Sequence, residues 1–300
     1  MLEAGLIVSR FLHYTATLIL FGVSLFPLYT YSELTAAPHL RWATTWLVAL
    51  AALLGGVFWF MSVTFSLAGT LDSDAVWSVL RETRFGKVWM ARFFLATIIL
   101  VLATLQLKSP PERVSWLFPA LCAGLLVSLA GVGHTQIDNG IAHVIHLSSD
   151  GLHLLAAGAW LGGLVSLFSL VARAVRTSTS ENNTEANNAA MRFAGMGYIA
   201  VATLIGSGLI NSWVLVGSLG NFGTPYGQLL IVKLFLFAGM LGLAGLNRFL
   251  IVPRLIKASG GGHATGLIKL RRHILGEQAL GLLIVLIVAA LGSIQPAVNP

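Results

Sequence analysis

Long apolar runs separated by short polar segments dominate this chain. A helix needs about 20 mostly apolar residues to cross the hydrocarbon core of a bilayer. The sequence lacks the residue-by-residue alternation over ten-residue segments that membrane β-barrels show. The pattern therefore predicts an all-α, polytopic membrane helical bundle with about eight transmembrane helices. The predicted helices cover residues 5–28, 43–69, 87–107, 114–133, 143–171, 193–216, 226–249 and 271–294.

Composition supports a membrane protein and predicts one integral membrane domain over residues 1–300. Hydrophobic residues make up 56 % of the 300 residues and charged residues only 10 %, whereas soluble domains carry about 25 % charged residues. The segment 173–192, rich in Ser, Thr, Asn and Glu, is predicted to be a polar cytoplasmic loop between the fifth and sixth spans. The single cysteine, Cys122, excludes an intrachain disulfide and cysteine-based metal clusters.

The distribution of basic residues predicts the orientation of the bundle. Twelve of the 18 Lys and Arg residues fall in loops on one side, and four, all within 81–92, fall on the other. The positive-inside rule assigns the richer side to the cytoplasm, so both termini are predicted to face outward. The net charge of +7 therefore reflects topology in a lipid bilayer, and we predict no nucleic-acid partner.

The most unusual polar segment lies at the outer mouth of the fifth span. Ionisable groups in a membrane span are costly and by default mark a functional site. The segment contains six metal-ligand residues: His134, Asp138, His143, His146, Asp150 and His153. The last four are separated by three, four and three residues, which places them on one face of an α-helix.

Depth along the helices predicts a polar layer in the outer half of the bilayer. A rise of about 1.5 Å per residue places Asp150 and His153 roughly 10–15 Å below the outer end of the fifth span. The other residues expected near this depth are Arg10, His13, Arg92, Asn211 and Lys233.

Two interpretations of this layer remain open. In the first, His13, Asp150 and His153 form a metal site that His134, His143 and His146 feed from outside. Imidazole and carboxylate are plausible copper ligands, and imidazole also serves copper(I). In the second, Asp150 neutralises Arg10, Arg92 or Lys233 in a structural network, and the histidines are hydrogen-bonding neighbours. Arg10, Arg92 and Lys233 are thus candidates for gating or ion pairing.

Glu277 is a further candidate on the last predicted span. It is expected within the first two turns from the cytoplasmic end, four residues after His273. The alternatives are an exit or proton-linked site and an ion pair with His273 or Arg248.

The order of several short motifs resembles the CopD copper-resistance family of bacterial inner-membrane proteins. The resemblance covers nearly the whole chain. Its fragments are Arg10 and His13, Thr83-Arg84-Phe85-Gly86, Trp89 with Arg92, Gly133-His134, His146, Asp150-Gly151, His153, Trp160-Leu161-Gly162-Gly163-Leu164, Thr224-Pro225-Tyr226-Gly227, Lys233, Asn247-Arg248, Pro253-Arg254-Leu255 and Glu277.

The resemblance implies copper import from the periplasm across the inner membrane, in copper homeostasis and resistance, by a protein that is not an enzyme. It also implies a separate periplasmic copper carrier of the CopC type as partner. Two rival hypotheses stay open: a haem b electron carrier with His13 and His153 as axial ligands, and a docking partner that binds copper proteins without transport. We expect His153→Ala and Asp150→Asn to impair copper handling more than His39→Ala or His263→Ala.

Overall fold

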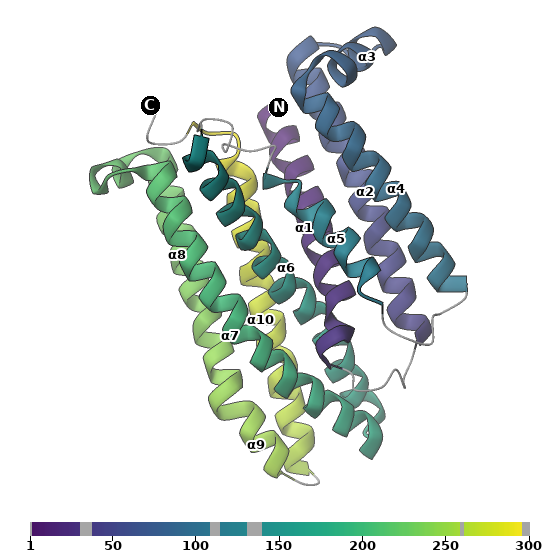
Figure 1. The fold of residues 1–300 in the computed structure, drawn as a ribbon. Coiled ribbons are helices and arrows are strands. Elements are labelled where there is room, and N and C mark those ends of the chain that lie inside the picture. Colours follow the sequence, from purple (N-terminus) through teal and green to yellow (C-terminus); the bar gives the residue numbers. More distant parts are fainter. Residues whose placement is uncertain (1, 31–37, 109–114, 131–139, 259–260, 296–300) are drawn as a thin grey trace.

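Helices make up nearly all of the described chain (Figure 1). The computed structural model describes residues 2–30, 38–108, 115–130, 140–258 and 261–295. The elements are α1 (Leu2–Thr30), α2 (Pro38–Ala68), α3 (Ser73–Glu82), α4 (Arg84–Lys108), α5 (Leu117–Val127), α6 (Gly140–Thr177), α7 (Ser180–Val216), η3 (Leu219–Gly223), α8 (Pro225–Leu246), η4 (Asn247–Ile251), α9 (Val252–Lys257) and α10 (Gly261–Leu291).

Seven helical segments of the described chain are long and apolar enough to cross a membrane. They are α1, α2, α4, α6, α7, α10 and the continuous run from α8 to α9. This confirms the predicted all-α polytopic membrane bundle. The remaining predicted span, 114–133, is represented by the shorter apolar helix α5.

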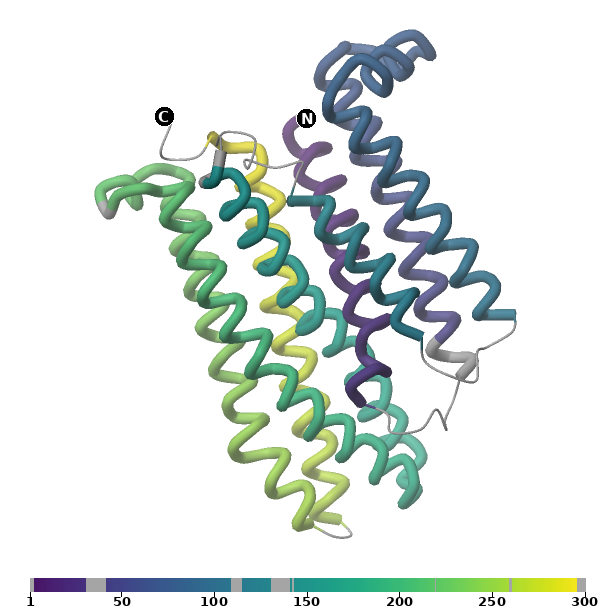
Figure 2. Tube along the Cα trace, viewed as in Figure 1, coloured from purple at the N-terminus to yellow at the C-terminus, as the bar shows by residue number. Residues whose placement is uncertain are grey.

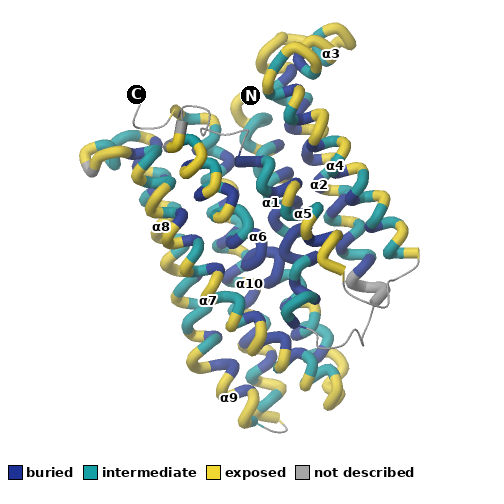
Figure 3. The backbone as a smooth tube through the Cα atoms, viewed as in Figure 1, coloured by how far each residue is buried: buried dark blue, intermediate teal, exposed yellow. Residues whose placement is uncertain are grey.

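In the bundle, α2 and α4 lie on one side and α7 and α8 on the other, with α1, α6 and α10 between them (Figures 1 and 2). α1 packs against α2 and α6, α6 packs against α7, and α10 packs against α8. α1 and α6 are the most buried spans, and Figure 3 shows buried residues concentrated in this centre. The start of α1 and the end of α10 lie together, since Arg10 Nη1 donates to Ser293 Oγ at 2.8 Å. By the positive-inside rule, this is the outer end.

Three glycines bring α1 and α6 into direct backbone contact. A Cβ atom added to Gly22 would lie 2.1 Å from the Gly158 carbonyl oxygen and 2.6 Å from Gly162 Cα. Small residues allow membrane helices to approach this closely, so their backbones contribute van der Waals contacts. This crossing fixes the two central helices relative to each other.

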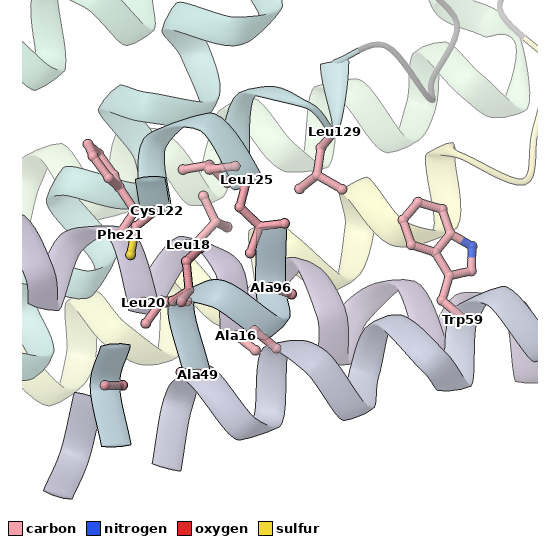
Figure 4. Close-up of a cluster of buried hydrophobic side chains, with 14 of the residues drawn as sticks. Ala16, Leu18, Leu20, Phe21, Ala49, Trp59, Ala96, Cys122, Leu125 and Leu129 are labelled. Carbon is pink, nitrogen blue, oxygen red and sulfur yellow. The ribbon is translucent and has the colours of Figure 1, made fainter. Parts of the chain in front are cut away.

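α5 ends earlier than the sequence pattern predicted, and its carboxyl end contacts a buried cation. Nη1 of Arg92 donates to the Leu125 carbonyl oxygen at 3.2 Å and also to Ser128 Oγ. Positive charge is stabilised at a helix C-terminus, where carbonyl groups lack helical partners. Cys122 on the same helix is buried in an apolar cluster with Phe21 of α1 (Figure 4).

The prediction of a polar loop over residues 173–192 was wrong for most of these residues, which are helical. α6 continues to Thr177, and α7 already begins at Ser180. Thr179 caps α7 by accepting a hydrogen bond from the Asn182 amide, which satisfies a free donor of the first turn. The alanines of this polar segment, among them Ala186, are buried, so the first turns of α7 pack against the protein through small apolar side chains.

The continuous helical run from α8 to α9 contains a π-turn that the apolar pattern did not reveal. Residues 247–251 form the π-helical segment η4, in which the Val252 amide donates to the Asn247 carbonyl five residues earlier. Pro253 follows directly, and a proline inside a helix removes one donor and crowds the preceding turn. The wider turn relieves this crowding and reorients Asn247.

Candidate functional site

The polar face predicted for the fifth span exists on α6. His146 is buried, and His143, Asp150 and His153 are half-buried on the same helix. Apolar side chains on the opposite side of this part of α6 are exposed: Ile141, Val144, Ile145 and Leu152. The predicted helical periodicity of three, four and three is therefore confirmed, and it turns the polar residues toward the protein interior.

Asp150 and His153 lie together against α7. Asn211 Nδ2 donates to Asp150 Oδ1 at 3.3 Å. The His153 Nδ1 atom lies 3.0 Å from Ser207 Oγ, and that hydroxyl donates to the Thr203 carbonyl at 2.5 Å. Because the Ser207 proton is used by Thr203, His153 Nδ1 carries the hydrogen and Nε2 keeps its lone pair. We call Asp150, His153 and Asn211 the Asp–His pocket.

The Asp–His pocket combines donors suited to a cation with a competing positive charge. Asn211 Oδ1 is buried and has no hydrogen-bond partner among the described residues. Lys233 of α8 interacts electrostatically with Asp150 and His153. Tyr14 and Tyr226 also interact with Asp150. The pocket thus has a carboxylate, an imidazole and an amide oxygen, with the Lys233 ammonium group near enough to interact with the carboxylate.

His13 belongs to a different arrangement on the other side of α1. Its Nδ1 atom lies 2.9 Å from the Ala52 carbonyl oxygen, which can only accept, so Nδ1 carries the hydrogen. The Nε2 lone pair accepts from Arg92 Nη2 at 2.5 Å. Both ring nitrogens are therefore in use, and binding of a metal by His13 would require Arg92 to move.

Aromatic rings and a glycine enclose His13. Its ring centroid lies 5.8 Å from that of Trp59 and 5.4 Å from that of Trp89. A Cβ atom on Gly56 would lie 3.2 Å from His13 Cε1 and 3.1 Å from a Trp89 ring carbon. The sequence around His13 is thus fitted to hold one ring orientation, with Arg92 over the Trp89 face.

The structure brings together only part of the predicted site. Asp150 and His153 both contact α7, through Asn211 and Ser207, whereas His13 contacts Arg92 of α4. Among the described residues, no group of three or more His, Cys, Asp or Glu side chains is arranged to hold a metal ion. His134, together with Asp138, lies outside the described residues.

The two histidines proposed as axial haem ligands point toward different helices. The His13 ring contacts α2 and α4, whereas the His153 ring contacts Ser207 of α7. A haem held between them would need both rings to turn toward a common gap.

Glu277 is placed deeper than the sequence suggested. α10 begins at Gly261, so Glu277 lies sixteen residues into the helix rather than in its first two turns. Its carboxylate accepts from Asn247 Nδ2 at 2.6 Å and from Trp160 Nε1 at 3.2 Å. These partners replace the expected ion pair with His273 or Arg248.

Two contributors to the pocket escaped the sequence reasoning. Ser207 orients His153, and Tyr14 interacts with Arg10, Arg92 and Asp150 from its position beside His13. Small hydroxyl residues on apolar helices give no pattern of their own. The adjacency of Tyr14 to His13 was the one available signal.

The fold and the Asp–His pocket define a multi-pass membrane protein with half-buried ionisable side chains between α6 and α7. The family described as copper resistance protein D-like, N-terminal domain, matches residues 1–144, and the copper resistance protein D (CopD) family matches residues 187–291. The chain belongs to the CopD copper-resistance family.

Similar proteins agree with this family. The chain is 28 % identical to inner membrane protein YebZ of Escherichia coli (strain K12), over 99 % of this chain and 100 % of that protein. It is 29 % identical to copper resistance protein D of Pseudomonas syringae pv. tomato, over 97 % and 96 %. It is 27 % identical to copper transport protein CutJ of Bacillus subtilis (strain 168), over 74 % of this chain but 39 % of that protein. No solved structure matches the chain.

Proposed function

We propose that this protein imports copper ions from the periplasm across the inner membrane, and that the Asp–His pocket is the first site at which the ion leaves water. The observation that supports the proposal is the placement of Asp150 and His153 on one face of α6, where Asp150 accepts from Asn211 and His153 contacts Ser207 of α7. The Asn211 Oδ1 atom beside Asp150 has no hydrogen-bond partner among the described residues. Membership of a copper-resistance family selects copper among the cations that such a pocket would bind.

The donor set suits a copper ion in transit better than one held permanently. His153 offers the Nε2 lone pair and Asp150 offers negative charge, while Asn211 adds a neutral oxygen. Imidazole is a good ligand for copper, whereas carboxylate and carbonyl oxygens bind it less selectively. A site with few strong ligands binds the ion and also releases it, as conduction requires.

Lys233 gives the Asp–His pocket a counter-charge. Its ammonium group interacts with Asp150. An entering copper ion competes with this group for the carboxylate, so the ammonium must move aside for the ion to bind. His146 and His143, one and two turns further out than Asp150 on the same face, form the route by which the ion arrives.

With both termini facing outward, the membrane potential drives copper inward and a periplasmic protein can deliver copper to the outer end. An inward-moving cation gains about 2.3 kcal/mol per elementary charge per 100 mV of inside-negative potential. A separate periplasmic carrier of the CopC type is the partner that delivers copper to the outer end.

Replacing either ligand of the Asp–His pocket is expected to lower copper uptake by at least roughly 10–100-fold, the range seen when supporting residues of metal sites are lost. The variants are Asp150→Asn, which keeps the side-chain shape, and His153→Ala. The measurement is the copper content of proteoliposomes after external metal is removed, with copper supplied as copper(II) and, with a reductant, as copper(I).

His263→Ala is the matched control. His263 lies at the inner end near the start of α10 and contacts Asn187, with 3.1 Å between His263 Nε2 and Asn187 Nδ2, far from the pocket. Its uptake is expected to equal that of the unmodified protein. Equal uptake by all three variants would reject the Asp–His pocket, and no uptake by the unmodified protein would reject transport itself.

A further inference from the structure

Glu277 is a buried acid in the interior of the membrane bundle that the Asp–His pocket does not use. Only 2 % of its surface is exposed. One carboxyl oxygen accepts from Asn247 and the other from Trp160. Both donors are neutral, so they orient the carboxyl group without compensating a negative charge.

No described basic side chain lies within ion-pair distance of Glu277. Arg248, next to Asn247, points away and donates to the Tyr198 hydroxyl at 3.2 Å. The titratable or charged residues nearest along the elements packed against it are His273 on α10, Arg248 on η4, Arg254 on α9, Lys233 on α8, His153 on α6 and Tyr29 on α1. An unpaired carboxylate in this setting is costly, whereas the neutral acid is not.

His273 provides a route for a proton from Glu277 toward the inner end of the bundle. It precedes Glu277 by four residues on α10, so the two side chains share one helix face. The His273 Nδ1 atom is buried and has no hydrogen-bond partner in the described part of the chain. An unpartnered imidazole nitrogen one turn away is a suitable acceptor for a proton that leaves the carboxyl group.

The Asn247 contact depends on a backbone segment with irregular helical geometry. Asn247 begins the π-turn that precedes Pro253. Its Oδ1 atom is buried without a partner among the described residues. Single π-turns inside α-helices are rare and occur frequently at functional sites. A return of this turn to α-helix would rotate Asn247 and change the hydrogen bonding of Glu277.

Trp160 links Glu277 to the polar face of α6. It lies seven residues inward of His153, or roughly 10 Å along the helix axis, and it is buried. The same helix face therefore carries His146, Asp150, His153 and then the group that touches Glu277. A cation that leaves the Asp–His pocket along this face approaches Glu277 next.

We propose that Glu277 is a proton-exchange site in the middle of the membrane, neutral in the resting protein, which releases its proton toward His273 when copper moves inward from the Asp–His pocket. The coupling to copper rests on the proposed function, whereas the neutral acid does not. In the step, the carboxyl O–H bond breaks, the proton passes to the His273 ring and then to inner water, and a proton from the outer side restores the neutral acid, so that each cycle transfers one proton inward.

The first test is the infrared carbonyl band of a neutral carboxylic acid in the metal-free protein at pH 7. We expect the band in the unmodified protein, its loss in Glu277→Gln, and its retention in Asp150→Asn, since Asp150 is neutralised by Lys233. Trp160→Phe removes a hydrogen-bond donor that favours the ionised form of Glu277, so the carboxylic-acid band of this variant should persist to higher pH. A band that is missing from the unmodified protein, or unchanged in Glu277→Gln, would overturn the proposal.

The second test follows protons during copper uptake. Proteoliposomes containing a pH-sensitive dye should acidify inside when copper(I) or copper(II) enters through the unmodified protein. Glu277→Gln should lose this signal at least about tenfold, the equivalent of roughly 1.4 kcal/mol. Copper entry with an unchanged proton signal in Glu277→Gln would exclude the coupling. If no copper enters through the unmodified protein, the transport proposal fails, and the infrared result alone decides the proton site.

Discussion

Replacing Gly22 with alanine is expected to abolish assembly of the bundle. The new methyl group would lie 2.1 Å from the Gly158 carbonyl oxygen and 2.6 Å from Gly162 Cα, and backbone atoms cannot rotate away as a side chain would. α1 and α6 must therefore separate along their whole contact. Overpacking of a core commonly costs about 1–3 kcal/mol and occasionally more, and we expect the upper end or beyond. The measurement is the amount of monodisperse protein that remains after detergent-solubilised samples are heated.

Gly206→Ala is the matched control for this substitution. Gly206 lies on an exposed part of α7, and an added Cβ would meet no atom within 4 Å. Alanine favours helix by about 1 kcal/mol over glycine, so this variant should be as stable as the unmodified protein or more stable. Equal stability of Gly22→Ala and Gly206→Ala would show that the central crossing is looser than described.

The fold was largely predictable because the membrane imposes a simple rule on sequence. Apolar length alone identified the seven long spans. The rule failed where polar residues are helical, as in the first turns of α7, because length and polarity do not report side-chain capping by Thr179. It also failed at α5, whose end depends on Arg92, a residue of another helix.

The candidate site was predictable along one helix but not between helices. Periodicity placed His146, Asp150 and His153 on a common face of α6, and the structure agrees. Counting residues along the helices, however, gives only the depth of a side chain in the membrane and not the direction in which it points from the helix axis. His13 has the expected height, but it faces Arg92 rather than Asp150. The Glu277 position was wrong because ten residues before the predicted span also belong to α10.

Removing the Arg92 side chain is expected to release α5 from the bundle. Arg92 is buried, and its guanidinium group donates to His13 Nε2, to the Leu125 carbonyl and to Ser128 Oγ. Arg92→Ala leaves His13 Nε2 without a donor, at a cost of about 1–3 kcal/mol. It also removes one partner each from the Leu125 carbonyl and Ser128 Oγ, although Ser128 Oγ still donates to that carbonyl. The opposing effect is relief from burying a charge, which insertion scales place at about 2.5–3.5 kcal/mol at a helix centre. Since several acceptors and a large buried volume are lost together, we expect Arg92→Ala to be destabilised.

Cys122 supplies a local readout of this release. It is the only cysteine in the chain and is buried on α5, so its rate of alkylation by a maleimide reports whether α5 remains packed. We expect labelling to be slow in the unmodified protein and at least about tenfold faster in Arg92→Ala, a change of roughly 1.4 kcal/mol in local opening. Arg92→Lys should be intermediate, because an ammonium group lacks the fork that reaches several acceptors at once.

Two further variants separate hydrogen bonding from charge burial at this position. Arg84→Ala removes an exposed arginine from the same helix and should leave Cys122 shielded. Arg92→Met fills much of the volume without donating hydrogen bonds, so it should label faster than Arg92→Lys and more slowly than Arg92→Ala. If Arg92→Met instead shields Cys122 better than arginine does, the cost of burying the charge exceeds the value of its hydrogen bonds. The arginine would then be retained for a reason other than the stability of α5.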